Sequence, residues 1–175
     1  MSGRTLVLGG ARSGKSAHAE GLLPAEGAAT YVATARRDPD DPEWTERIAT
    51  HVRRRPASWQ TVEAPNPADL PELLRGRTAT DPPMLVDDVA TWLTNALDDL
   101  KWASSPTDET DELVSAVRDC PARLVLVSAE VGLGVVPATR SGRLFRDELG
   151  SLNARLAEVC DEVLLLVAGI PMRLR

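Results

Sequence analysis

Residues 9–16 constrain the fold of this chain more than any other segment. They read GGARSGKS and fit the pattern G-x-x-x-x-G-K-[ST] at every fixed position. The apolar run at residues 5–8 predicts a short buried strand before the motif, and residues 16–23 predict a short helix that ends before Pro24. This order of strand, loop and helix is the setting in which the motif binds phosphate groups. The segment therefore predicts a phosphate loop for a nucleoside triphosphate.

The spacing of this loop follows from the chemistry of phosphate binding. Glycines let successive backbone N–H groups turn toward one point, where the positive end of the following helix adds to their attraction for phosphate oxygens. Lys15 is expected to reach the outer phosphates, and the Ser16 hydroxyl is expected to ligate Mg²⁺. The predicted nucleotide-binding residues of the loop are Gly9, Gly10, Ala11, Arg12, Ser13, Gly14, Lys15 and Ser16.

Length and charge narrow the class of protein. A chain of 175 residues is most simply one domain, here residues 1–175, and it is long enough to bury a sizeable core. The net charge of -6 disfavours a general nucleic-acid binder, because proteins that follow a phosphate backbone carry a basic excess. A small molecule or another protein is the expected partner.

The cysteines and the N-terminus indicate the compartment. Cys120 and Cys160 are too few and too far apart for a disulfide framework or a metal knuckle, and both adjoin apolar runs that suggest burial. The sequence shows neither a signal-peptide pattern nor an apolar segment of membrane-spanning length. We expect a cytoplasmic protein without a membrane span.

Short aliphatic runs alternate with helical stretches from end to end. This alternation predicts an α/β fold, with a mostly parallel sheet and helices on both faces. The predicted strands are residues 5–8, 29–33, 60–63, 84–86, 123–128 and 162–168. The predicted helices are residues 16–23, 43–54, 69–74, 89–100, 109–119 and 142–160.

Two acids follow the apolar run at residues 84–86. Asp87 is expected at the carboxyl end of a strand, where open parallel sheets bind their ligands, and it is a natural Mg²⁺ partner for Ser16. The alternative is that Asp87 and Asp88 only cap the next helix. The phosphate loop favours the metal role, and Asp87 is preferred over Asp88.

The two histidines have different expectations. On a helix over residues 43–54, His51 lies on a largely apolar stripe with Trp44 and Ile48, which is typical of a packed core histidine. The alternative is a neutral imidazole that attacks phosphorus while neighbouring arginines steady the phosphates. His18 is expected to be exposed on the first helix, with no catalytic role.

Several segments together resemble a known family. Besides GGARSGKS, they are YVAT at residues 31–34, RI at residues 47–48 followed by His51, RPASW at residues 55–59 and EVGLGVVP at residues 130–137. The chain resembles the bifunctional adenosylcobinamide kinase/adenosylcobinamide-phosphate guanylyltransferase family of cobalamin biosynthesis. The resemblance spans nearly the whole chain.

The resemblance implies a specific pair of reactions. Such enzymes phosphorylate the aminopropanol hydroxyl of adenosylcobinamide with ATP or GTP, and then transfer GMP from GTP to the new phosphate through a guanylylated histidine. The matching position is His51, so the resemblance reverses the structural interpretation of that residue. The positions that match contacts to GTP or its metal are Ala33, Thr34, Ala35, His51, Val52, Arg53, Arg54, Glu63 and Asp87.

The resemblance also implies a RecA-like sheet with one antiparallel strand, and a homotrimer. Two features depart from the family pattern. Residues 36–42 are unusually rich in proline and acid, and Thr50 stands where a second histidine is common, which leaves His51 as the candidate nucleophile.

Two other functions stay open from the residues. One is a small-molecule kinase of the phosphate-loop class that performs no guanylyl transfer, with His51 structural. The other is a nucleotide-dependent regulatory module that signals through the loop around Gly132 and Gly134. A switch GTPase is disfavoured because the N-K-x-D signature for guanine is missing.

Overall fold

The computed structural model describes residues 3–36 and 55–175. Its sheet has seven strands in the order β3-β2-β4-β5-β1-β6-β7. All neighbouring strands are parallel except β6 and β7, which pair antiparallel. The strands are β1 Arg4–Gly9, β2 Ala29–Ala33, β3 Trp59–Glu63, β4 Met84–Asp87, β5 Leu124–Ala129, β6 Glu162–Val167 and β7 Ile170–Arg173. The α/β expectation is confirmed.

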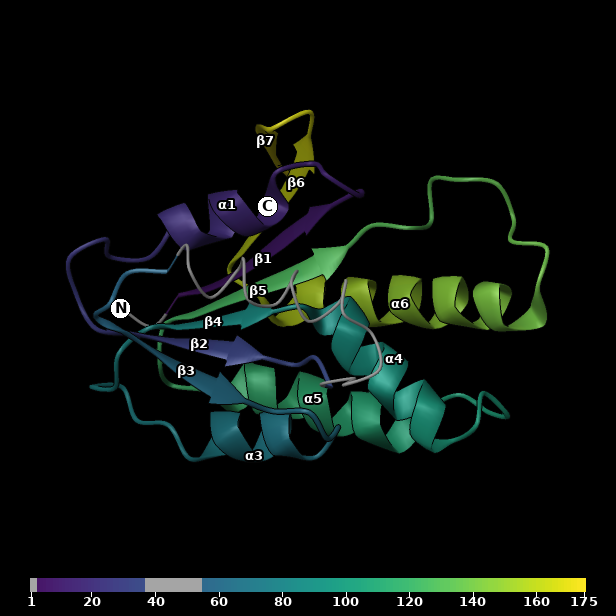
Figure 1. Ribbon diagram of the computed structural model, residues 1–175, viewed down its shortest axis with the longest axis horizontal. Coiled ribbons are helices and arrows are strands. Elements are labelled where there is room, and N and C mark those ends of the chain that lie inside the picture. The colour runs from purple at the N-terminus through teal and green to yellow at the C-terminus, as the bar shows by residue number, and fades with distance from the viewer. Residues whose placement is uncertain (1–2, 37–54) are drawn as a thin grey trace.

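Helices cover both faces of this sheet (Figure 1). The short helix α1 lies on one face, and the remaining described helices lie on the other. The helices are α1 Lys15–Gly21, α3 Asp69–Arg75, α4 Val89–Asp99, α5 Thr107–Asp119 and α6 Arg140–Val159. The helix expected at residues 43–54 lies outside the described residues.

Alternating strand residues build a separate core on each face. Val7, Tyr31 and Leu85 point to the side of α1, where they join Ala19 and Leu23. Their strand neighbours point to the other side and pack against α3, α4, α5 and α6. A parallel strand that is buried on both faces must be apolar throughout, which is why these strands read as continuous aliphatic runs.

Two predicted helices begin two residues earlier in the structure than in the sequence analysis. α5 starts at Thr107, inside the expected loop, because Pro106 provides the first carbonyl acceptor and the acids of the first turn favour a helix N-terminus. α6 starts at Arg140 because the Thr139 side chain accepts a hydrogen bond from the Gly142 N–H and caps the helix.

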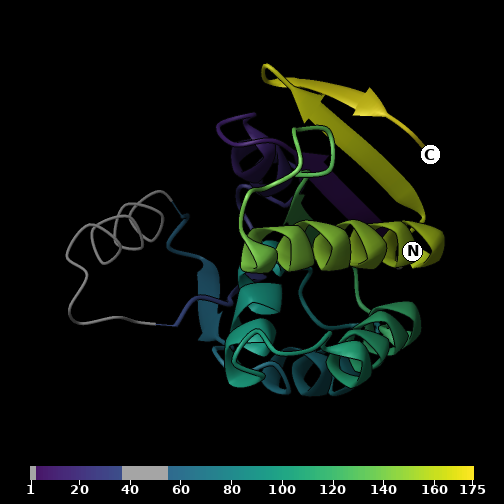
Figure 2. The ribbon, with the colours of Figure 1, turned by 90° about the vertical axis from the view of Figure 1, so that its right-hand side faces the viewer.

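The alternation of strands and helices did not predict β7. The chain reverses after β6 through Ala168 and Gly169, which both have positive φ, and returns as an edge strand. Figure 2 shows this hairpin standing at one margin of the sheet. The antiparallel strand that the family resemblance implies is therefore present.

Both cysteines are buried, as expected, and neither forms a disulfide. Burial raises the pKa of the Cys160 thiol to about 12 and also raises that of Cys120. Among the described residues, no helix is both long and apolar enough to cross a membrane.

Candidate functional site

The segment between β1 and α1 forms a tight loop at the carboxyl end of the sheet. Gly14 has φ of 88° and Arg12 has φ of 57°. A Cβ at Gly9 would lie 2.3 Å from the Ser13 Oγ and 3.1 Å from the Leu166 carbonyl oxygen, so a larger residue there would force the Ser13 side chain to move. No side chain caps the start of α1, so its first N–H groups stay available to an anion. This geometry is that of a phosphate loop.

Lys15 folds back across this loop. Its Nζ donates a hydrogen bond to the Gly10 carbonyl oxygen at 3.3 Å. A phosphate oxygen above the loop is a stronger acceptor, because the hydrogen bond would then join two opposite charges. The Lys15 ammonium is therefore within reach of a bound phosphate chain.

The structure brings the two candidate metal ligands into contact. The Ser16 Oγ lies 3.5 Å from the Asp87 Oδ1, across 71 residues of sequence. β4 ends at Asp87, and the sheet order places β4 and β1 on either side of β5. A hydroxyl and a carboxylate oxygen are hard ligands of the kind that Mg²⁺ takes together with phosphate oxygens. The residues present fit this ion.

Asp88 has a different task. Its Oδ1 accepts a hydrogen bond from the Ala90 N–H at 2.9 Å and caps the start of α4. The two acids therefore have different roles: Asp88 caps α4, and Asp87 faces Ser16. The capping alternative applies to Asp88 and not to Asp87.

The other nucleotide-contact candidates among the described residues lie at the same edge of the sheet. Ala33 pairs in register with Asp87 on one side and with Glu63 on the other. Thr34 follows at once and is fully buried. Its Oγ1 donates to the Asp88 carbonyl at 2.8 Å and accepts from the Asp88 N–H at 3.2 Å, which joins the ends of β2 and β4.

Asn95 of α4 is a supporting residue that sequence reasoning missed. It is buried, and its Nδ2 donates to the carbonyl oxygens of Thr34 at 2.7 Å and Pro65 at 3.1 Å. One side chain thus holds the segments that follow β2 and β3. A lone amide on the apolar stripe of α4, beside Trp92 and Ala96, was the available signal.

Replacement of Asn95 with alanine tests this support. Asn95→Ala removes the Asn95 donor from the buried Thr34 carbonyl oxygen and one of two donors from the Pro65 carbonyl oxygen, which keeps the Arg36 Nε, so we expect the free energy of unfolding to fall by about 1–3 kcal/mol. Nucleotide binding should weaken as well, because the segment at residues 33–35 loses its anchor. Urea unfolding and calorimetric titration measure the two effects. Thr94→Val, which removes a hydrogen bond within α4 only, should leave nucleotide binding intact.

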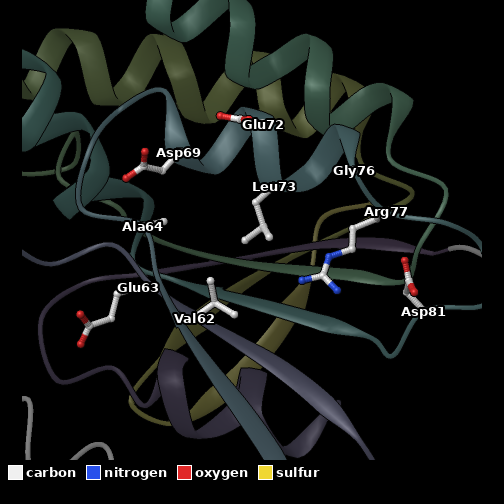
Figure 3. Close-up of a pocket in the computed structure, with 9 residues that line it drawn as sticks. All are labelled: Val62, Glu63, Ala64, Asp69, Glu72, Leu73, Gly76, Arg77 and Asp81. Atoms are coloured by element: carbon white, nitrogen blue, oxygen red, sulfur yellow. The ribbon is translucent and has the colours of Figure 1, made fainter.

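A cavity of about 570 Å³ lies between β3 and α3. Figure 3 shows Leu73 pointing toward Val62 in the middle of the cavity. The Arg77 guanidinium points into the cavity from the side where Asp81 lies. Its lining residues are Val62, Glu63, Ala64, Asp69, Glu72, Leu73, Gly76, Arg77 and Asp81. The carboxylates outnumber the single guanidinium, so the charge of the cavity disfavours a triphosphate chain, and the phosphate loop remains the candidate site for that chain.

The structure corrects the expectation for His18. The side chain is half-buried rather than exposed, and its Nε2 is buried without a hydrogen-bond partner among the described residues. His18 lies on the side of α1 that faces the rest of the protein. The remaining candidates, His51, Val52, Arg53 and Arg54, lie outside the described residues.

The fold is shared with a solved ATPase. The structure is similar to a chain described as a prototypical ATPase from the type III secretion system of pathogenic bacteria, with a TM-score of 0.52 and 12% identity. The match covers 94% of this chain and 51% of that one, so this chain spans about half the length of that ATPase. At this identity the likeness concerns the fold alone, which is the α/β fold of phosphate-loop ATPases.

Three relatives are similar along nearly their whole length. A bifunctional adenosylcobalamin biosynthesis protein CobP of Pseudomonas aeruginosa strain PAO1 is 43% identical over 98% of this chain and 97% of its own. Proteins named CobU with the same description are 40% identical in Salmonella typhimurium strain LT2 and 38% identical in Escherichia coli strain K12, each over 97% of this chain and 98% of the relative.

A family model agrees with these relatives. The model for cobinamide kinase / cobinamide phosphate guanyltransferase, CobU, matches residues 5–174. The match includes the phosphate loop, Asp87 and the segment that carries His51. The chain is therefore an enzyme of the cobinamide kinase / cobinamide phosphate guanyltransferase family.

Proposed function

We propose that this enzyme phosphorylates adenosylcobinamide with ATP or GTP, and then transfers GMP from GTP to adenosylcobinamide phosphate to give adenosylcobinamide-GDP. The observation that carries the proposal is the contact between Ser16 of the phosphate loop and Asp87, in a chain that the family matches over residues 5–174. This contact supports one site for the triphosphate and its metal, as both reactions need.

In the kinase step, the loop residues 9–16 bind the phosphate chain and Lys15 stabilises its outer phosphates. Ser16 and Asp87 would hold Mg²⁺, which would supply positive charge to offset the negative charge that builds up on the phosphates during transfer. The aminopropanol oxygen of the corrinoid attacks the γ-phosphorus and loses its proton, and the nucleoside diphosphate leaves. The chain's own contribution is to align this attack and to hold the phosphates still.

In the guanylyl transfer, the neutral imidazole of His51 attacks the α-phosphorus of GTP. A P–N bond forms, the bond from the α-phosphorus to the bridging oxygen breaks, and pyrophosphate leaves. The cobinamide phosphate oxygen then attacks the same phosphorus and displaces the imidazole. Lys15 offsets the charge on the leaving pyrophosphate.

The remaining candidates contact the nucleotide in this proposal. They are Ala33, Thr34, Ala35, Val52, Arg53, Arg54 and Glu63. Ala33 ends β2 and is followed by Thr34 and Ala35, and Glu63 ends β3. These described members lie at the sheet edge that holds Asp87, which supports their assignment. Arg53 and Arg54 steady the phosphates beside His51. We also propose that the enzyme works in the cytoplasm as a homotrimer, as the family resemblance implies.

Incubation with GTP labelled at the α-phosphate tests the proposal. We expect the protein to retain a label that is labile to acid and stable to base, as a P–N bond requires. GTP labelled at the γ-phosphate should leave no label, because that phosphorus departs with pyrophosphate. A protein that phosphorylates cobinamide without any α-label would be a kinase alone, and one that binds GTP without either reaction would be a regulatory module.

A further inference from the structure

Asp87 has a second partner, which lies on the face of the sheet that α1 covers. The Tyr31 hydroxyl donates a hydrogen bond to the Asp87 Oδ2 at 2.6 Å. β2 and β4 are neighbouring parallel strands, and Tyr31 points into the core between them and α1, with only 2% of its surface exposed. A buried phenol in this position costs free energy unless its hydroxyl has a partner, so the contact with Asp87 serves both groups.

Tyr31 is the donor in this contact, because the Asp87 carboxylate oxygen accepts and the phenol hydroxyl carries the proton. The proton points at the Asp87 Oδ2 and leaves the Oδ1 as the oxygen that faces Ser16.

Arg55 holds the tyrosine ring from its outer face. Its guanidinium carbon lies 3.3 Å from the centre of the Tyr31 ring, within the range of a cation–π contact. The Arg55 Nη1 donates to the Thr61 Oγ1 of β3 at 2.9 Å, which fixes the plane of the guanidinium. Arg55 also follows His51 by four residues in the sequence. Arg55, which follows the proposed nucleophile in the sequence, therefore contacts the Tyr31 ring. The hydroxyl of that ring contacts the proposed metal ligand Asp87.

We propose that Tyr31 is a positioning residue for the metal site: it fixes the Asp87 carboxylate so that a single oxygen faces the metal, and Arg55 keeps the ring in place. This inference rests on the proposed function, in which Asp87 holds Mg²⁺. Carboxylates that bind metals are commonly oriented by a hydrogen bond to their other oxygen, and loss of such a partner weakens metal binding by about 10- to 100-fold. Tyr31 is not a catalytic residue, because Asp87 stands between it and the reacting groups.

Manganese binding measures this effect without any turnover. Mn²⁺ replaces Mg²⁺, and free Mn²⁺ is counted by electron paramagnetic resonance, without corrinoid, in the presence of a GTP analogue whose α- and β-phosphates are joined by a methylene group, so that His51 cannot displace the leaving group. Tyr31→Phe keeps the ring under Arg55 and removes only the hydroxyl. We expect the dissociation constant of Mn²⁺ from the complex to rise by about 10- to 100-fold. An unchanged constant in a folded Tyr31→Phe protein would overturn the inference.

Two more variants distinguish a failure of the metal assignment from a failure of the positioning role alone. Asp87→Asn should weaken Mn²⁺ binding at least as much as Tyr31→Phe; if it has no effect, the metal assignment of the proposed function is wrong. If Asp87→Asn weakens binding and Tyr31→Phe does not, only the positioning role fails. Thr110→Val removes a buried hydroxyl of α5, far from Asp87 in the fold, and should leave Mn²⁺ binding unchanged while it reports general destabilisation.

The chain contains one tyrosine, which permits a direct spectroscopic test. Protein labelled with 3-fluorotyrosine should give a single ¹⁹F resonance from position 31. We expect this resonance to shift when Mg²⁺ is added to the complex with the GTP analogue, and to stay in place in Asp87→Asn. A resonance in the native protein that does not respond to Mg²⁺ would count against the coupling. Arg55→Lys, which loses the planar stack, should broaden the resonance because the ring is held less firmly.

Discussion

His51→Ala is expected to abolish the α-phosphate label and all guanylyl transfer, while the protein stays folded. The substitution removes the nitrogen that forms the P–N bond in the proposed mechanism, so residual transfer should fall below detection. The kinase step should survive in part, because phosphoryl transfer to an alcohol needs no covalent enzyme intermediate. Melting temperature, labelling and kinase turnover are measured on one preparation.

The structural alternative for His51 predicts a different pattern. Loss of a packed core histidine would lower the melting temperature and reduce both activities together. His18→Ala provides the comparison, because the chain has only these two histidines. A stable His51→Ala protein that still becomes labelled, together with a His18→Ala protein that does not, would transfer the nucleophile to His18.

Lys15→Ala should remove both activities, each by about a hundredfold or more, because both reactions use the triphosphate that the loop positions. The Lys15 ammonium already lies across the loop, 3.3 Å from the Gly10 carbonyl oxygen, and no second lysine lies near it in the sequence. Initial rates of phosphorylation and of label incorporation are the measurements.

The chain's other lysine gives the control for that prediction. Lys101 lies in the exposed turn after α4, so Lys101→Ala removes the same charge from a surface position and should leave both rates unchanged. A Lys15→Ala protein that forms labelled histidine at the native rate would contradict the assignment of the loop lysine.

The sequence predicted the parts of this structure that depend on local pattern. The aliphatic runs around Leu6 and Leu126 had to be strands buried on both faces, and the loop at residues 9–16 had one compatible geometry. The sequence pattern did not predict β7. Every residue of this strand is exposed, so the strand has no buried face that would require a pattern of alternating apolar and polar residues. Its signal was the turn at Ala168 and Gly169, which lacks the asparagine that usually marks such a hairpin.

The supporting residues of the site could not be found from sequence. Asn95 and Tyr31 act on atoms 61 and 56 residues away, and only the strand order brings those atoms near. The choice between Asp87 and Asp88 likewise depended on which carboxylate the start of α4 takes as its cap. For His51, the apolar stripe favoured a core residue and the family resemblance favoured a nucleophile. That conflict is left to the His51→Ala experiment.

The hairpin at the sheet margin bears on how the protein avoids polymerising. An outer strand exposes unpaired N–H and C=O groups and can recruit another sheet edge, and β7 adds the exposed apolar side chains of Ile170 and Met172 to that hazard. Pro171 sits between them and withholds one backbone donor, and Arg173 adds a positive charge. Pro171 and Arg173 therefore disfavour the pairing of β7 with another sheet edge, and so the growth of fibrils.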